Sequence, residues 1–512
     1  MLKRRSLLNV ATAIIFKIIL LFGSFLVRRY LIRFAGNEIN GLNSLYLSII
    51  GALSVVDLGI GEAITFCMYK PIVNGETDKV SSLYNLFRRI YIIIGGIIAI
   101  AGCALMPILP YLAKGYTTID TNLYVTFGLM LVSTVLTYFF SAKVSLMNAY
   151  RDNYVSTAIS SSGLLLQQVL QILVIAITRS FVCFLACRIM AVLAQWIFTD
   201  VITRKKYRAV IENNTVGIDK NTKNEIIKNV KALFMHKIGN MLVNTIDSLI
   251  ISAFIGVAIL GKYSNYTTIL TGMTGVIALF FTPLTSTIGH LFVQDKEAFK
   301  NYYNFFCAFN FSLGCIFFLG YYSIIDNLIT LLFGTGLELS RSISFVITVN
   351  YFVQFMRQST QTFKDASGLF YFDRWKPIAE GLFNLVLSIA FVLLFQKIWG
   401  DNFAVIGVIV ATIITNLAIC HVVEPFVLYK HALHLPVRKY YVRNYSYIAG
   451  FIFLLIVLDF CMITAENTMI ELLINGCIAV GISLIPIVTM IVIDKDFRYY
   501  TMKFLTKRKG VG

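Results

Sequence analysis

Long apolar runs separated by short polar segments dominate the chain from end to end. A helix needs about 20 apolar residues to cross the hydrocarbon core of a bilayer, so each run is long enough for one span. The pattern predicts an all-α integral membrane protein with about 14 transmembrane helices. These cover residues 8–34, 41–68, 90–112, 122–146, 156–178, 182–203, 236–256, 263–289, 304–325, 344–368, 377–396, 403–423, 444–463 and 468–493.

Composition agrees with this pattern. The 512 residues are 58% hydrophobic and 14% charged, whereas soluble domains carry about 25% charged residues. The net charge of +18 does not indicate nucleic-acid binding, because the basic residues gather in short loops as membrane topology demands. The apolar run after the basic start, Met1 to Arg5, is too long for a signal peptide, so we expect a retained first span.

The basic residues also predict the orientation. With the N-terminus inside and residues 204–237 counted as one polar segment, the predicted cytoplasmic segments hold 31 Lys and Arg residues and the outer loops hold five. Positive residues favour the cytoplasmic side of a membrane. Both termini are therefore expected in the cytoplasm, with an even number of spans.

One polar segment, residues 204–237, divides the chain. From Lys220 onward, apolar residues recur at helical spacing beside Lys223, Lys228 and Lys231. This is either an amphipathic helix whose lysines meet anionic lipids, or a solvated linker. The predicted organisation is an N-lobe at 1–203, a cytoplasmic linker at 204–235, a C-lobe at 236–423, and two further helices with a basic tail at 424–512.

The two lobes resemble each other. A shift of 220 residues places Phe34, Gly36, Ile39, Gly41, Tyr46 and Ile49 on Phe254, Gly256, Ile259, Gly261, Tyr266 and Ile269. The matches fall at the outer turn between the first and second helix of each half, which indicates a parallel repeat. We expect two pseudo-symmetric six-helix lobes around a central cleft, an architecture for alternating access.

Charged residues inside predicted spans are the most informative chemistry, since such charges usually face a water-filled path or a partner. Eight cations lie there: Lys17, Arg28, Arg29, Arg33, Lys143, Arg188, Arg357 and Lys364. The arginines of the first helix either snorkel to the outer headgroups or line the cleft, where guanidinium binds phosphate in bidentate fashion. The candidate substrate-binding residues are Arg28, Arg29, Arg33, Arg188 and Arg357.

The other charges are expected to be structural or to couple transport to an ion. Lys17 lies at about the depth of Asp57 and Glu62, so an ion pair and a coupling site both fit. The repeat places Asp247 beside Arg28 or Arg29, which suggests a latch between the lobes.

The remaining polar groups have plainer interpretations. Lys143, Lys364 and Asp365 lie near cytoplasmic helix ends, where snorkelling is expected. The polar face of Gln167, Gln168 and Gln171 either bonds between helices or contacts sugar hydroxyls. The nine cysteines and five histidines show no ligand spacing, so no metal or cofactor is expected. No set of nucleophile and base is apparent, so the protein is not expected to be an enzyme.

Three stretches resemble a known family: residues 36–46 (GNEINGLNSLY), residues 53–64 (LSVVDLGIGEAI), and Tyr69–Ile72 with the loop after it. They are similar to the Wzx-like polysaccharide flippases, whose superfamily also holds multidrug/toxin extruders and lipid II flippases. The match covers about residues 20–95. It implies transfer of undecaprenyl-diphosphate-linked oligosaccharides across a bacterial cytoplasmic membrane, for capsule, O-antigen or a wall polymer. A glycan polymerase and a chain-length regulator are the implied protein partners.

Three alternatives stay open. A cation-coupled multidrug extruder should have an acidic cavity, which the surplus of cations disfavours. A membrane-embedded polymerase or glycosyltransferase usually needs a large extramembrane loop, whereas the longest outer stretch here, residues 326–343, is short. A scaffold without transport activity would not explain a charged interior.

Overall fold

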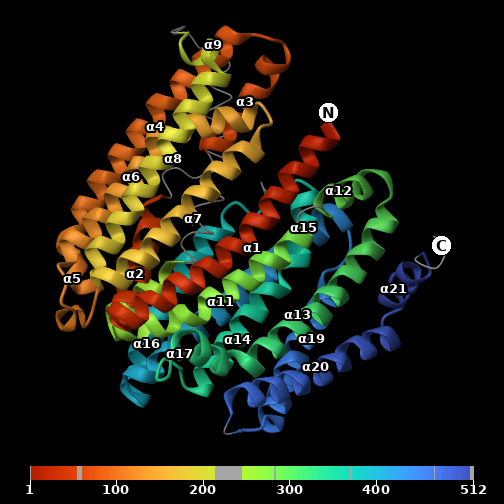
Figure 1. The fold of residues 1–512 in the computed structure, drawn as a ribbon. Coiled ribbons are helices and arrows are strands. Elements are labelled where there is room, and N and C mark those ends of the chain that lie inside the picture. The colour runs from red at the N-terminus through yellow and green to blue at the C-terminus, as the bar shows by residue number, and fades with distance from the viewer. Residues whose placement is uncertain are drawn as a thin grey trace. The chain divides into compact units, whose positions relative to one another are not determined.

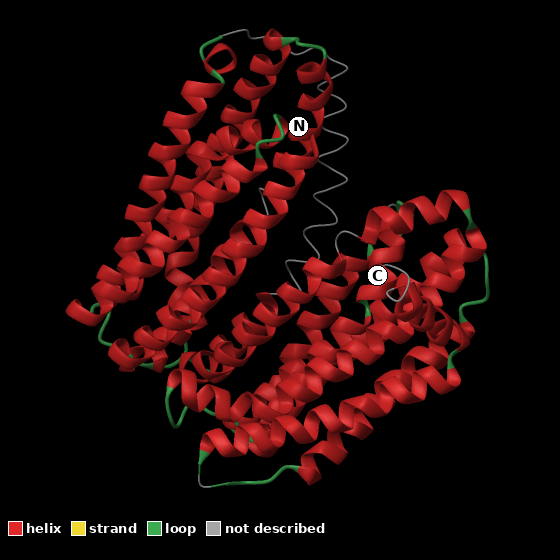
Figure 2. Cartoon of the chain, turned by 45° about the vertical axis from the view of Figure 1, so that its right-hand side comes forward, coloured by secondary structure: helices red, strands yellow, loops and turns green. Residues whose placement is uncertain are grey.

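The structure of the protein is a computed structural model that describes residues 2–54, 60–213, 245–281, 284–369, 372–465 and 467–507. Within these ranges every regular element is a helix (Figure 2), which confirms the all-α prediction. The predicted amphipathic helix after Lys220 and the first part of the predicted seventh span, residues 236–244, lie outside the described residues.

The chain divides into two compact units, Met1–Gly261 and Lys262–Gly512. The predicted lobe and linker boundaries, and the predicted cleft, stay predictions. The helices of unit 1 (Figure 1) are α1 (Leu2–Ala35), α2 (Asn37–Leu53), α3 (Ile60–Val73), α4 (Thr77–Leu105), α5 (Leu109–Leu112), α6 (Leu123–Ala149), α7 (Asn153–Thr178), α8 (Phe181–Lys206) and α9 (Arg208–Ile211). A π-helix, Ile251–Ile255, precedes α11 (Val257–Phe281), which begins in unit 1 and continues into unit 2.

Unit 2 contains the remaining helices. They are α12 (Leu284–Gln294), α13 (Lys296–Phe333), α14 (Arg341–Met356), α15 (Gln358–Ala366), α16 (Lys376–Trp399), α17 (Asp401–Thr415), α18 (His421–Leu428), α19 (Arg438–Cys461), α20 (Thr468–Ile493) and α21 (Lys495–Lys507). Two π-helices, Asn416–Cys420 and Tyr429–Leu433, flank α18. The core follows α13, whose Tyr303 packs against Phe363 of α15; both rings are fully buried, with centroids 5.0 Å apart.

Within the described ranges, nine helical runs are long and apolar enough to cross a membrane. The first predicted span corresponds to α1, which is 34 residues long. From Lys17 to its end, α1 contains four basic residues. The second is divided between α2 and α3, and residues 55–59 between them are outside the described residues. The predicted tenth span, 344–368, is also divided, because α14 ends at Met356 and α15 starts at Gln358.

The helices of unit 1 pack in a row in which α1 contacts α7, α7 contacts α8, α8 contacts α6, and α6 contacts α4. Gln168 of α7 donates a 3.0 Å hydrogen bond to the Leu20 carbonyl of α1. Gln171 donates a 3.3 Å bond to the Phe184 carbonyl of α8. These bonds confirm the interhelical role of the two glutamines, since a polar side chain inside an apolar bundle needs a partner.

The joint found through the sequence repeat has matching geometry in both halves. Gly36 precedes α2 with φ 94°, and Gly256 precedes α11 with φ 137°. These backbone angles favour glycine, which has no Cβ to clash. The two joints also meet within unit 1, where the Asn37 side chain donates a 2.7 Å hydrogen bond to the Ala258 carbonyl.

Candidate functional site

Among the described residues, a heavily charged interior site lies in unit 2, where two helices are interrupted. Arg357 occupies the turn between α14 and α15. The π-helix Asn416–Cys420 separates α17 from α18, and Pro425 lies inside α18. Both features disturb the regular backbone ladder, and π-bulges are frequent at functional sites.

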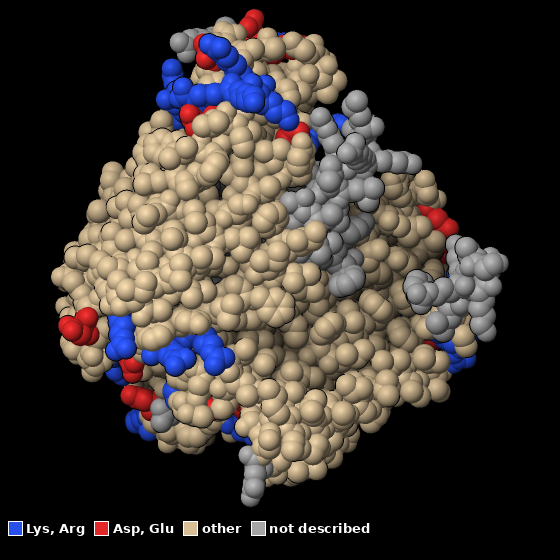
Figure 3. All heavy atoms as spheres, viewed as in Figure 1, with Lys and Arg blue, Asp and Glu red and all other residues tan. Residues whose placement is uncertain are grey.

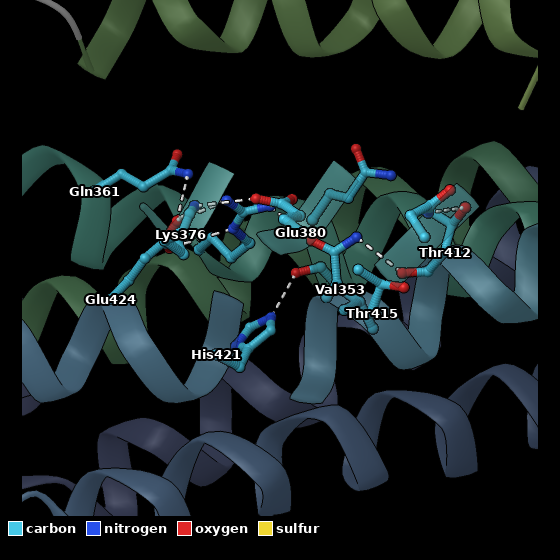
Figure 4. A network of polar contacts seen from close by, with 12 residues as sticks. Val353, Gln361, Lys376, Glu380, Thr412, Thr415, His421 and Glu424 are labelled. Carbon is cyan, nitrogen blue, oxygen red and sulfur yellow. Dashed lines mark hydrogen bonds and ion pairs between the residues drawn. The ribbon is translucent and has the colours of Figure 1, made fainter. Parts of the chain in front are cut away.

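Arg357 is held by two carboxylates, those of Glu424 and Glu380, which are labelled in Figure 4. Its Nη2 lies 2.6 Å from Glu424 Oε1 and its Nε lies 3.2 Å from Glu424 Oε2, which is a bidentate pair. Its Nη1 lies 3.3 Å from Glu380 Oε1 and 2.6 Å from Asn416 Oδ1. Bidentate pairs between arginine and carboxylate fix geometry as well as charge.

Lys376 completes the site from the first turn of α16. Its Nζ lies 2.5 Å from Glu424 Oε1 and 3.2 Å from Glu380 Oε2. Gln361 of α15 donates a further 3.3 Å bond to Glu424. Two cations and two anions therefore balance, and each of these four residues is at most 8% exposed. We call Arg357, Lys376, Glu380 and Glu424 the charge cluster.

Neutral polar groups surround the charge cluster (Figure 4). His421 Nε2 lies 3.0 Å from the Val353 carbonyl, and its Nδ1 lies 2.9 Å from the Asn444 amide nitrogen. A carbonyl only accepts and an amide N–H donates, so these partners assign the proton to Nε2 and leave the ring uncharged. Asn384 donates a 2.9 Å bond to Thr412, which links α16 to α17.

The charge cluster can hold interrupted helices together, but it has no surplus positive charge to offer an anion. Burying four charges has a large desolvation cost, which the mutual pairing offsets. Arg357 was expected among cations that meet substrate phosphate. In the structure, Glu424 and Glu380 bind the Arg357 guanidinium instead, so a phosphate would first have to displace a carboxylate.

Unit 1 places three of the predicted substrate-binding arginines on α1. Arg28 is half-buried, and Arg29 and Arg33 are exposed. The Arg33 guanidinium lies 5.7 Å from the Phe34 ring centroid, and that of Arg179 lies 6.0 Å from the same ring. Cations attract the face of an aromatic ring at such distances. The end of α1 is thereby placed beside the turn between α7 and α8.

Arg188 lies on α8 at a similar depth to Arg28. Each is seven residues from the helix end at that side, Phe181 for α8 and Ala35 for α1, which is about 10 Å at 1.5 Å per residue. The half-buried Arg188 directs Nη1 to the Met130 sulfur at 3.5 Å. A thioether is a weak acceptor. Among the described residues Arg188 has no carboxylate partner, in contrast to Arg357.

Two lysines for which snorkelling is expected are paired with carboxylates in the structure. Lys143 of α6 pairs with Asp200 of α8, and Lys364 of α15 pairs with Asp373. The Lys364 side chain is buried, and Asp373 compensates its charge within unit 2. Asp365, the next residue, is exposed.

The remaining predicted charges are placed only in part. Lys17 is exposed on α1, and Asp247 is buried in unit 1. Asp57 and the side chain of Glu62 lie outside the described residues. The predicted ion pair of Lys17 and the predicted latch at Asp247 stay predictions. The described residues hold no group of three or more His, Cys, Asp and Glu side chains suited to a metal ion.

Most of the charge cluster was missed from the sequence, although signals for it exist. Lys376 and Glu380 are four residues apart at the start of an apolar run, a spacing that pairs side chains on one helix face. The predicted twelfth span ends at residue 423, which leaves Glu424 outside it. The structure continues in helical form to Leu433, so Glu424 and Pro425 lie within the apolar run.

The surface of unit 1 fits a membrane. On the visible face, basic side chains gather where α1 ends near α2 and again beside α9 (Figure 1, Figure 3). Uncharged side chains cover α4, α6 and α8 between them. Exposed apolar residues on these helices include Ile93, Ile100 and Ile197. An apolar belt between two charged ends is the surface that a bilayer requires.

Comparison with solved structures identifies the fold. An inward-facing multidrug resistance MATE family transporter of the MOP superfamily aligns over 83% of this chain and 94% of its own, with TM-score 0.57 and 11% identity. The lipid II flippase MurJ, in an inward closed conformation, aligns over 95% of this chain and 99% of its own, with TM-score 0.63 and 14% identity. The chain has the MurJ and MATE fold.

A MATE transporter from Vibrio cholerae also matches, with TM-score 0.51 and 15% identity over 84% of this chain and 99% of that one. No protein-family model matches the chain, and no curated protein matches its sequence. The MurJ and MATE fold, together with the long apolar helices, makes the chain a multi-pass membrane protein.

Proposed function

We propose that the protein is a flippase that moves undecaprenyl-diphosphate-linked oligosaccharides from the inner to the outer leaflet of a bacterial cytoplasmic membrane by alternating access, for surface polysaccharide synthesis. The observation that carries the proposal is the likeness to the lipid II flippase MurJ along nearly the whole of both chains. The sequence resemblance of residues 20–95 to Wzx-like flippases supports the oligosaccharide.

The cations of unit 1 support a substrate with a diphosphate. Arg188 is a half-buried guanidinium whose described polar partner is only the Met130 sulfur. A charged side chain at that depth is costly unless water or a partner compensates its charge. A diphosphate is a suitable partner, because guanidinium binds phosphate oxygens through two parallel hydrogen bonds. Arg28, Arg29 and Arg33 extend the positive charge along α1.

The proposal is tested by reconstituting the protein into liposomes with a fluorescent undecaprenyl-diphosphate oligosaccharide and measuring its transfer between leaflets with an external quencher. The wild-type protein is expected to accelerate transfer. Arg188→Gln should slow it about 10-fold or more, since hydrogen bonds to charged groups contribute about 1.5–3 kcal/mol. Met130→Leu keeps the packing and the arginine, so it should retain most of the activity.

Normal transfer by Arg188→Gln would remove the assignment of this residue, and absence of transfer by the wild-type protein would remove the substrate. The MATE likeness favours multidrug export as a second candidate function. Accumulation of a cationic dye in cells separates the two, because an extruder lowers dye uptake and a glycolipid flippase leaves it unchanged.

A further inference from the structure

A groove of about 430 Å³ lies between α7 and α8 within unit 1. It is lined mainly by apolar side chains from both helices, namely Ala158, Ser162, Leu166, Ala194, Phe198 and Ile202. Among these, Leu166 is 41% exposed and Phe198 is 61% exposed. These exposed lining residues place the groove at the surface of the unit. Both helices are also long and apolar enough to cross a membrane, so this surface is apolar.

Small residues create the groove. Gly163 carries no side chain where a Cβ would lie 2.1 Å from Gln195 Cγ, so the glutamine can lie across α7 at this level. Ala158 and Ala194 leave space that larger side chains would fill. A void lined by apolar groups loses dispersion contacts, and an acyl chain from the bilayer restores them.

The groove has the length of a lipid chain within one leaflet. Its α7 residues run from Ala158 to Leu166, which is about 12 Å at 1.5 Å per residue. Half of the hydrocarbon core is about 15 Å thick. The groove starts near the end of the bundle, because Ala158 is only five residues inside α7, which begins at Asn153.

Basic residues lie at that same end. Lys205 follows the groove residue Ile202 by less than one turn of α8, and Arg151 precedes α7 in the turn after α6. Both side chains are exposed. Their neighbours Lys206 and Arg204 are paired with Asp152 and Asp200.

Across the described residues, neither Arg151 nor Lys205 has a carboxylate partner. Two uncompensated cations at the level of the headgroups attract anionic lipid. They lie beyond the end of an apolar groove on the same pair of helices. The two features together match the head and one chain of an anionic amphiphile.

We propose that the groove binds one acyl chain of an anionic glycerophospholipid whose phosphate contacts Arg151 and Lys205. A polyprenyl chain is much longer than the groove, so the glycerophospholipid is the favoured occupant. This lipid site is independent of the proposed transport substrate. It requires only that the protein lies in a membrane.

The site is tested on the full chain in nanodiscs of phosphatidylcholine with a minor fraction of phosphatidylglycerol, followed by native mass spectrometry of the released protein. The wild-type protein should retain one phosphatidylglycerol in preference to phosphatidylcholine. Ala194→Trp, which fills the groove, should lower this retention about fivefold or more. The double substitution Arg151→Gln and Lys205→Gln should do the same by removing the headgroup contacts.

Two matched controls should retain the lipid at the wild-type level: Val169→Trp, on α7 outside the groove lining, and Lys439→Gln, an exposed lysine of unit 2. If Ala194→Trp does not fold, Ala158→Leu provides a smaller filling. Equal retention in the groove-filled and wild-type proteins would overturn the proposal. Equal retention of both lipids, or displacement of phosphatidylglycerol by equimolar undecaprenyl phosphate, would overturn it as well.

Discussion

At the scale of single residues, Glu424 is the acceptor on which the charge cluster depends, since it pairs with both Arg357 and Lys376. Glu424→Gln removes the negative charge and leaves two buried cations with one carboxylate. Breaking a buried pair in this way costs about 3–5 kcal/mol. Thermal unfolding of the detergent-solubilised protein, followed by intrinsic fluorescence, should show a clear fall in Tm.

Glu297→Gln is the matched control, because Glu297 is exposed near the start of α13 and should change Tm little. Adding Arg357→Gln to Glu424→Gln restores the charge balance of the remaining pair, so part of the lost stability should return. Equal Tm changes in Glu424→Gln and Glu297→Gln would show that the cluster does not stabilise unit 2.

The same residues show what a sequence can predict about charged sites. A cation inside an apolar run is visible in the sequence, as Arg357 and Lys364 are. Their partners Glu424 and Asp373 lie 67 and nine residues away along the chain. Only the tertiary fold brings such groups together, so the sequence could identify a charge as unusual without showing that it is compensated.

At the scale of helices, Gly41 controls the contact of α2 with the start of α11. A Cβ on Gly41 would lie 1.8 Å from the Val257 carbonyl oxygen, which belongs to the backbone and cannot move aside. Gly41→Ala should therefore destabilise the protein by about 1–3 kcal/mol, as overpacking does. Gly51→Ala, also on α2, would meet only the Thr245 methyl group at 3.7 Å. Gly51→Ala should therefore express and unfold like the wild-type protein. If Gly41→Ala and Gly51→Ala unfold at the same temperature, tight packing at Gly41 is excluded.

Helix boundaries were harder to predict than helices, and the reasons are local. The repeat pointed to Gly36 and Gly256, because glycine at a positive φ is a requirement of the backbone itself. The interruption at Arg357 and the π-helix at Asn416–Cys420 have no glycine or proline at the break. Side-chain contacts of the charge cluster accompany these breaks, and a hydropathy pattern does not contain those contacts.

At the scale of the whole molecule, the apolar pattern was enough to predict a helical membrane protein, and the MurJ and MATE fold agrees with it.

The orientation in the membrane stays a prediction that rests on 31 basic residues in the predicted cytoplasmic segments against five in the outer loops. Reporter fusions test it, since alkaline phosphatase is active only outside the cytoplasm and green fluorescent protein only inside. Green fluorescent protein after Lys507 should fluoresce, and phosphatase inserted after Gly115 or Gly400 should be active. If phosphatase placed after Lys507 is active, that end of the chain lies outside the cytoplasm. With a cytoplasmic N-terminus, the number of spans would then be odd, which contradicts the predicted even number.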